Sequence, residues 1–271
     1  MHAPASKNCD PRPIGMFDSG LGGLTVMKQL VRALPNEHVI YFGDTARIPY
    51  GSKSRETVVR YSIENSIFLI EKEIKVLVVA CNTATSHALD KLRNIFSLPV
   101  VGVVDPGAEH AVNVTAHGRI AVLGTKGTIL SQAYQKAILL RAPHATVVPI
   151  ACPLFVHLVE EGCIDHPAAG LVVQEYLKPL KGQNIDTILL GCTHYPLLTD
   201  LIRKEMGPDV AIVDSATSCA EKVATLLGEN HLKNGAAASP TYQYFVSDDP
   251  AKFQSLGQAF LGTPIGSVHS T

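Results

Sequence analysis

The sequence contains no apolar run that approaches the roughly 18 residues a transmembrane helix needs. Its first segment, Met1–Pro13, is polar and proline-containing and lacks the apolar stretch of a signal peptide. We therefore expect a cytoplasmic protein without membrane association, in which Met1–Pro13 forms a disordered tail.

Concentrated positive charge is also missing. The 271 residues include 23 Lys and Arg against 24 Asp and Glu, and no basic tract is longer than a couple of residues. Without a basic surface to attract phosphates, no nucleic-acid partner is expected, and a small molecule is predicted as the target. Hydrophobic residues at 46% and charged residues at 17% are typical of a globular chain, and its length predicts about two domains or lobes.

Closely spaced cysteines are absent as well. The six cysteines are scattered, with no C-x-x-C pair: Cys9, Cys81, Cys152, Cys163, Cys192 and Cys219. In a cytoplasmic chain of this size they are not expected to form disulfides. Each is then a buried apolar filler, a metal ligand or a reactive thiol.

Short apolar, β-branched runs alternate with segments of helical period along most of the chain. The predicted strands are Ile14–Phe17, Val39–Phe42, Val76–Ala80, Val100–Val104, Ile120–Leu123, Thr146–Ile150, Ile188–Leu190, Val210–Val213 and Thr241–Val246. Most are apolar throughout, which is typical of strands buried on both faces of a parallel sheet. The alternation predicts an α/β fold of mainly parallel sheets flanked by helices. Ser218 and Glu221 form a capping box that predicts a helix over Ala220–Leu227, and a loop is predicted over Gly235–Pro240.

Two pairs of segments repeat the same plan. The runs that lead to Cys81 and Cys192 each have a strand, a small residue, the cysteine, and then hydroxyl or amide residues. The strands before Asp18 and before Thr125 each lead into a small polar loop and a helix. The two cysteines are 111 positions apart, and Asp18 and Thr125 are 107 apart. These similar offsets predict two pseudo-symmetric lobes whose equivalent strand ends face one another.

Cys81 and Cys192 are each predicted between the end of a strand and the start of a helix. Ligands of open α/β sheets bind at the carboxyl ends of the strands, and a helix N-terminus favours a thiolate. The side chains of Asn82, Thr83 and Thr193 follow directly and can hold a carboxylate. A single cysteine in such a place is usually structural, but two in matched contexts predict a functional pair.

Two opposed thiols are suited to inverting a carbon stereocentre. Inversion needs a base that removes a proton from one face and an acid that delivers another proton to the opposite face. A free thiol titrates at about 8.5, so both of its protonation states are accessible in a cell. The pattern therefore predicts an enzyme that inverts the stereocentre of a small amino acid.

Other interpretations of the cysteines have less support. A zinc site would have to combine dispersed ligands without the usual close pairs, namely Cys81, His87, Cys192 and His194. A dithiol redox site needs a resolving partner close by. A pyridoxal enzyme needs a Schiff-base lysine, which neither Val76–Asp90 nor Thr187–Asp200 contains. The alternative of another class is a non-catalytic small-molecule binding protein in which both cysteines are structural.

The glycine-rich loop Asp18–Thr25 matches neither the dinucleotide-binding pattern nor the phosphate loop, which would include a lysine. A tight strand-to-helix turn is predicted instead, with backbone N–H groups that can bind a substrate carboxylate together with Ser19. Asp18 is predicted as a hydrogen-bond partner of the nearby thiol, as a helix cap, or as both.

Four segments together resemble the glutamate racemase family, within the aspartate/glutamate racemase superfamily. They are Phe17–Val26, Asp44–Gly51, Val79–Ala84 and Leu190–Pro196. They occur in the order of the family, and the resemblance covers nearly the whole chain beyond Pro13. As a set they are very specific, although each alone is modest evidence.

This resemblance implies a reversible, cofactor-independent interconversion of L- and D-glutamate that supplies D-glutamate for peptidoglycan. It also implies that Cys81 deprotonates D-glutamate and that Cys192 deprotonates L-glutamate. Asp18 would support Cys81, while His194 and an acidic residue in Leu158–Glu161 would support Cys192.

The family motif places that acid on Glu160 in preference to Glu161. The residues expected to hold the substrate are Asp18, Ser19, Tyr50, Gly51, Asn82, Thr83, Thr125, Thr193 and His194. Without the resemblance, Tyr50 and Gly51 would be assigned to an ordinary turn after Pro49. The two-thiol device does not itself select chain length, so a racemase for aspartate or another small acid is the alternative enzyme.

The resemblance also implies a division into lobes. Residues 1–98 and 211–271 would form the first lobe and residues 99–210 the second, with the site in the cleft and closure by a hinge.

Glutamate is the expected small-molecule partner, no cofactor or metal is expected, and the expected assembly is a homodimer. His157 departs from the family, where an apolar residue or proline is expected, and we predict an exposed loop position for it.

Overall fold

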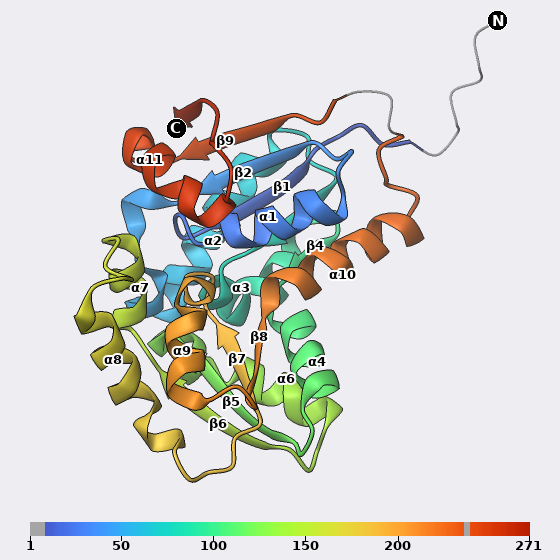
Figure 1. Cartoon of the computed structure of the whole chain (residues 1–271). Helices are drawn as coiled ribbons and strands as arrows, with labels where there is room; N and C mark the ends of the chain where they lie inside the picture. Colours follow the sequence, from blue (N-terminus) through green and yellow to red (C-terminus); the bar gives the residue numbers. More distant parts are fainter. Residues whose placement is uncertain (1–8, 236–238) are drawn as a thin grey trace, which may run out of the picture.

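Two separate parallel sheets form the framework of the chain, one above the other in Figure 1. The structure, a computed structural model, describes residues 9–235 and 239–271. The predicted tail up to residue 8 and the middle of the predicted loop Gly235–Pro240 lie outside the described residues. Among the described residues, no helix is long and apolar enough to cross a membrane.

The two sheets repeat one strand order. The first runs β10 (Val268–Ser270), β9 (Tyr242–Val246), β2 (Val39–Gly43), β1 (Ile14–Asp18), β3 (Val76–Val79), β4 (Val100–Gly102). The second runs β6 (Thr146–Ala151), β5 (Arg119–Gly124), β7 (Thr187–Gly191), β8 (Ala211–Asp214). All paired neighbours are parallel, and β2-β1-β3-β4 corresponds to β6-β5-β7-β8. The predicted α/β fold of two lobes with the same plan is confirmed.

Helices cover both faces of each sheet. Around the first sheet lie α1 (Leu24–Ala33), α2 (Arg55–Ile70), α3 (Asn82–Ile95) and α11 (Pro250–Leu261). Around the second lie α4 (Val104–Val114), α5 (Lys126–Ser131), α6 (Ala133–Arg141), α7 (Leu154–Glu160), α8 (Pro167–Leu177) and α9 (Thr199–Met206). Helix α10 (Ser215–Glu229) packs against both α1 and α4, and so joins the lobes. Short 3₁₀ turns include η1 (Thr45–Arg47), η2 (Tyr50–Ser52), η3 (Lys178–Leu180) and η4 (Tyr195–Leu198).

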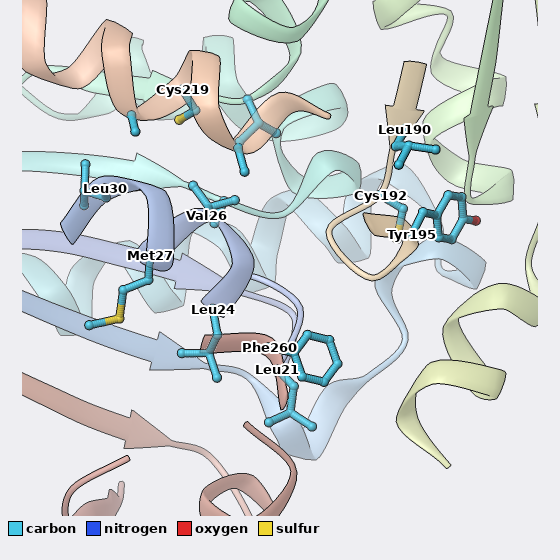
Figure 2. Close-up of a cluster of buried hydrophobic side chains, with 14 of the residues drawn as sticks. Leu21, Leu24, Val26, Met27, Leu30, Leu190, Cys192, Tyr195, Cys219 and Phe260 are labelled. Carbon is cyan, nitrogen blue, oxygen red and sulfur yellow. The ribbon is translucent and has the colours of Figure 1, made fainter. Parts of the chain in front are cut away.

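The strands are apolar because both of their faces are buried. Along β1, Ile14 and Met16 point into one core cluster, while Phe17 points into the cluster on the opposite face. One of these clusters extends across both lobes, and Figure 2 shows Leu24 of α1 and Leu190 of β7 within it. The strand ends of the two lobes are therefore held together by a shared core.

The chain crosses between the sheets later than the predicted lobe boundaries at residues 98 and 210. Strand β4 pairs with β3 in the first sheet, and β8 pairs with β7 in the second. The crossings therefore follow Gly102 and Asp214. Each sheet gains an edge strand before the chain leaves it, and hydropathy alone cannot assign an edge strand to one sheet or the other.

The predicted start of the helix over Ala220–Leu227 is wrong. Helix α10 begins at Ser215, where Asp214 accepts hydrogen bonds from the N–H groups of Ala216 and Thr217 at 2.8 and 3.4 Å. Ser218 lies inside the helix, and its Oγ is 2.9 Å from Nδ1 of His110 on α4. The short, mostly exposed edge strand β10 was not predicted because it lacks an apolar pattern.

His157 is exposed, as predicted, but it lies on helix α7 and not in a loop.

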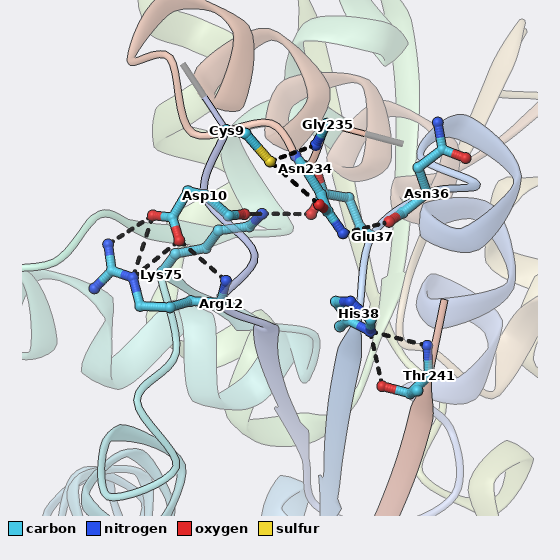
Figure 3. Close-up of polar contacts among 10 residues, drawn as sticks. All are labelled: Cys9, Asp10, Arg12, Asn36, Glu37, His38, Lys75, Asn234, Gly235 and Thr241. Atoms are coloured by element: carbon cyan, nitrogen blue, oxygen red, sulfur yellow. Dashed lines mark hydrogen bonds and ion pairs between the residues drawn. The ribbon is translucent and has the colours of Figure 1, made fainter. Parts of the chain in front are cut away.

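The described end of the predicted tail makes polar contacts with the first lobe (Figure 3). The Asp10 N–H donates to the Lys233 carbonyl at 3.2 Å, and the Asp10 carbonyl accepts from Lys75 Nζ at 2.8 Å. The expectation of a disordered tail is therefore wrong for residues 9–13.

Candidate active site

The carboxyl ends of β1, β3, β5 and β7 meet at a small cavity between the lobes. We call it the inner cavity, and its walls are Ser19, Pro49, Tyr50, Gly51, Cys81, Asn82, Thr83, Thr125, Val156, Glu160, Cys192, Thr193 and His194. Its volume is about 20 Å³, so the lobes are closed around it. With the exception of Asp18, every predicted site residue lines it, and Pro49 and Val156 are walls that the sequence did not suggest.

Cys81 caps helix α3 from the end of β3. Its Sγ accepts a hydrogen bond from the Ala84 N–H at 3.4 Å. Burial and the nearby charge of Asp18 raise the pKa of the Cys81 thiol, while the Ala84 N–H and the Ser19 hydroxyl act in the opposite direction. The thiol form is thus favoured until a substrate or a change in a neighbouring charge stabilises the thiolate.

Asp18 lies behind Cys81 at the end of β1 and is completely buried. Its Oδ2 accepts the Gly20 N–H at 3.1 Å, while Oδ1 has no hydrogen-bond partner within the described part of the chain. Burial raises the pKa of this carboxyl group. The protonated form of Asp18 is therefore favoured more than in an exposed aspartate, whereas its predicted direct contact with the substrate stays a prediction.

On the opposite side, Cys192 belongs to a chain of polar side chains. Its Sγ is 3.8 Å from Nδ1 of His194, whose Nε2 is 2.9 Å from Oε1 of Glu160. Burial alone would lower the pKa of His194, but the hydrogen bonds with Cys192 and Glu160 raise it to about 10. At neutral pH the imidazole is then protonated, which places a positive charge 3.8 Å from the Cys192 sulfur.

Glu160 and Glu161 have different surroundings. The Glu160 side chain is 11% exposed and contacts His194, whereas the Glu161 side chain is 69% exposed and lies 3.8 Å from Nζ of Lys252. The geometry therefore favours Glu160 as the partner of the Cys192 side.

Amide and hydroxyl groups line the cavity next to the thiols. The Asn82 Oδ1 accepts from the Tyr134 hydroxyl at 2.6 Å, and its buried Nδ2 has no protein partner among the residues described. The Oγ1 atoms of Thr83 and Thr125 are 2.9 Å apart across the two lobes. A donor without a partner in a closed polar cavity is available to a ligand carboxylate.

A hydrogen-bond network that the sequence did not reveal holds the turn at Tyr50 and Gly51. The Tyr50 hydroxyl donates to the buried carboxylate of Asp44 and accepts from Asn65 Nδ2 at 3.0 Å. A Cβ added to Gly51 would lie 2.5 Å from Cβ of Thr125. This glycine is required by the close approach of the lobes, which explains its place in the cavity wall.

The glycine-rich loop forms a second close contact between the lobes. A Cβ added to Gly22 would lie 2.2 Å from Oγ1 of Thr193 and 2.6 Å from Nδ1 of His194. The Thr25 hydroxyl donates to the Thr193 carbonyl at 3.2 Å. The loop thus supports the Cys192 side of the cavity, in accord with the predicted tight turn.

The alternative zinc ligands do not converge. His87 lies on α3 and is absent from the walls of the inner cavity. Within residues 9–235 and 239–271, no group of three or more His, Cys, Asp or Glu side chains is arranged to hold a metal ion.

Comparisons with known proteins extend over both lobes. The family model for Asp/Glu/Hydantoin racemase matches residues 14–223. A glutamate racemase from Geobacter metallireducens is 52% identical over 258 residues, which cover 95% of this chain and 96% of that protein.

Two crystal structures are similar over nearly their full length. That of glutamate racemase isoform RacE1 from Bacillus anthracis has a TM-score of 0.92 and 40% identity, covering 96% of this chain and 97% of that one. That of glutamate racemase from Francisella tularensis in complex with D-glutamate has a TM-score of 0.91 and 40% identity, covering 97% and 98%.

Proposed function

The chain belongs to the Asp/Glu/Hydantoin racemase family, and on this premise we propose that it is an isomerase that interconverts L- and D-glutamate without a cofactor. The observation that carries the proposal is the placement of Cys81 and Cys192. Both thiols line one closed cavity, each from a different lobe. The similar protein from Francisella tularensis was crystallised in complex with D-glutamate, which supports glutamate as the substrate here.

The proposed reaction is a transfer of two protons at Cα. When L-glutamate binds, the Cys192 thiolate removes the Cα proton and the Cys81 thiol delivers a proton to the opposite face, giving D-glutamate. The reverse reaction exchanges these roles. The assignment of each thiol to one enantiomer follows from the family resemblance alone.

The substrate carboxylates would be held by donors in the cavity wall. The Asn82 Nδ2 and the N-terminus of α3 would bind one carboxylate on the Cys81 side. Ser19, Gly51, Thr83, Thr125 and Thr193 supply the other polar groups of the wall. The inner cavity has room for little more than one water molecule, and a site with so little water strengthens these interactions as the Cα proton leaves.

A deuterium experiment tests this function. The purified, reduced protein in deuterium oxide, with no added cofactor, should label Cα of D-glutamate and abolish its optical rotation over time. Proton NMR and polarimetry measure the two effects. Folded protein that produces neither contradicts the proposal, and faster reaction of aspartate in the same assay would overturn glutamate as the substrate.

Gly22→Ala is expected to lower kcat/KM for glutamate by about 10²-fold, because the added methyl group must displace Thr193 and His194. A coupled assay for the product enantiomer measures the change. Gly170→Ala is the matched control, since a Cβ there meets no atom within 4 Å. Unchanged kinetics of the Gly22 variant would show that the loop does not position the Cys192 side.

The proposal includes a cellular role. D-glutamate would be supplied for peptidoglycan in the cytoplasm, where the reducing environment keeps both catalytic thiols free. The homodimer expected from the sequence remains a prediction, which sedimentation equilibrium can test.

A further inference from the structure

Tyr134 does not line the inner cavity, yet its hydroxyl group reaches a residue of the cavity wall. Tyr134 belongs to α6 in the second lobe, and its side chain is completely buried. The hydroxyl donates to Oδ1 of Asn82 at 2.6 Å. Asn82 is the first residue of α3 in the first lobe and directly follows Cys81. This hydrogen bond therefore connects the two lobes beside the Cys81 side of the site.

The Tyr134 ring is held in place by its packing against two glycines. A Cβ added to Gly191, which directly precedes Cys192, would lie 3.0 Å from Cε2 of the ring. A Cβ added to Gly107 of α4 would lie 3.3 Å from the hydroxyl oxygen and 2.9 Å from Cβ of Ser215. Because neighbouring backbone and side chains pack this closely around it, the phenol has little freedom to move.

The phenol is a permanent hydrogen-bond donor. Burial raises the pKa of Tyr134, while the Ser215 hydroxyl acts in the opposite direction. Ser215 begins α10, directly after the second crossing between the lobes. The phenol keeps its proton throughout the physiological pH range, and within the described part of the chain that proton is donated to Asn82 Oδ1.

The amide of Asn82 has two ends of similar size and opposite hydrogen-bonding character. With Oδ1 held by Tyr134, the Nδ2 end is left for the inner cavity, and it has no partner among the described residues. In the reversed orientation a carbonyl oxygen would face the substrate carboxylate and repel it, and the phenol hydrogen would point at an N–H donor. A fixed donor behind the amide therefore selects the orientation that binds an anion.

We propose that Tyr134 is a positioning residue, which holds the Asn82 amide with its N–H end toward a carboxylate of the substrate. This inference deepens the proposed function and rests on it for the identity of the ligand. Tyr134 does not touch the substrate and acts through Asn82. Because the carboxylate carries its charge before as well as during proton transfer, loss of the amide orientation should weaken the binding of both enantiomers.

Tyr134→Phe tests the proposal, because it removes the hydroxyl group and keeps the ring. Isothermal titration calorimetry should give a Kd for D-glutamate about tenfold higher than in the unaltered protein, with the same stoichiometry. Interconversion of enantiomers releases no net heat, so turnover does not obscure the binding signal. KM for each enantiomer should rise by a similar factor. A hydroxyl with only a structural role would instead lower the stoichiometry and leave Kd and KM unchanged, which would overturn the proposal.

The effect should also depend on Asn82. In an Asn82→Ala background, the further change Tyr134→Phe should alter Kd by less than about twofold, because the amide that it orients is gone. A tenfold effect that persists in this background would overturn the positioning role. Tyr176→Phe is the matched control and should keep Kd and KM, since the Tyr176 hydroxyl accepts the Leu154 N–H at 3.3 Å and neither residue lines the inner cavity.

The same titrations separate this inference from the proposed function. Glutamate binding without racemisation by the unaltered protein would refute the function, while the comparison of Kd values would still decide the role of Tyr134. No binding of glutamate by the unaltered, folded protein would overturn both.

Discussion

Cys81→Ser and Cys192→Ser are each expected to lower the rate of glutamate racemisation by at least about 10³-fold, equivalent to about 4 kcal/mol in activation free energy. A serine hydroxyl is far less acidic than a thiol, so it neither forms the anion that removes the Cα proton nor donates a proton as readily. Both cysteines line the inner cavity, one from each lobe, so neither thiol can take over the role of the other on the opposite face of Cα. Initial rates of product formation from each enantiomer measure the loss.

The two serine variants should also fail in complementary ways. Cys81→Ser keeps the Cys192 base and should still exchange the Cα proton of L-glutamate in deuterium oxide, without inverting it. Cys192→Ser should exchange only D-glutamate. Proton NMR of the recovered substrate distinguishes the two patterns. If each variant exchanged the opposite enantiomer, the assignment of the thiols would be reversed.

Cys163→Ser supplies the control for the thiol substitutions. Cys163 is a free, partly exposed cysteine of the second lobe and is absent from the inner cavity. Its kinetics should match those of the unaltered protein. Racemisation by Cys81→Ser or Cys192→Ser at a rate similar to that of Cys163→Ser would refute the two-base mechanism and favour structural cysteines.

Lys75→Met is expected to lower the free energy of unfolding by about 3–5 kcal/mol. Lys75 and Glu37 form an ion pair in the first lobe, and their side chains are 0% and 3% exposed (Figure 3). Removal of the ammonium group leaves the Glu37 carboxylate buried, and the Asn234 N–H at 2.8 Å is then its one partner among the described residues. Urea denaturation followed by circular dichroism measures the loss.

A second variant separates the charge effect from packing. Lys75→Met combined with Glu37→Leu removes both charges and should be more stable than Lys75→Met alone, because no unpaired carboxylate remains. Lys91→Met, at an exposed position, should change stability by less than about 0.5 kcal/mol. A Lys75→Met protein as stable as Lys91→Met would show that the buried pair contributes nothing to folding.

The Lys75–Glu37 pair also shows what the sequence leaves undetermined. Lys75 directly precedes β3 and Glu37 lies two residues before the start of β2, yet no pattern relates the two positions. They meet because β2 and β3 both flank β1, which brings the amino ends of these strands to one edge of the sheet. Pairing of strands distant in sequence determined this contact.

Local sequence was sufficient to predict that both thiols lie at strand ends. An apolar run followed by a small residue places Cys81 and Cys192 at strand ends, and parallel sheets bring such ends to a common edge. The helix predicted directly after each cysteine is present only after Cys81, because Cys192 is followed by the 3₁₀ turn η4. The roles expected for Ser19 and Tyr50 depended on the family resemblance, since neither residue is distinguished by local pattern alone.

The sequence by itself determined the parallel α/β framework, the common plan of the lobes and the two thiols, because hydrophobic periodicity and strand-end position are local properties. Tertiary structure decided which neighbouring acid meets His194. Consecutive residues at the end of α7 point in different directions, so Glu160 faces the cavity and Glu161 faces Lys252. Tertiary structure also decided that Gly22 must lack a side chain, since Thr193 reaches it from the other lobe. Contacts between lobes depend on how two independently patterned units pack, and that packing is not encoded in any single segment.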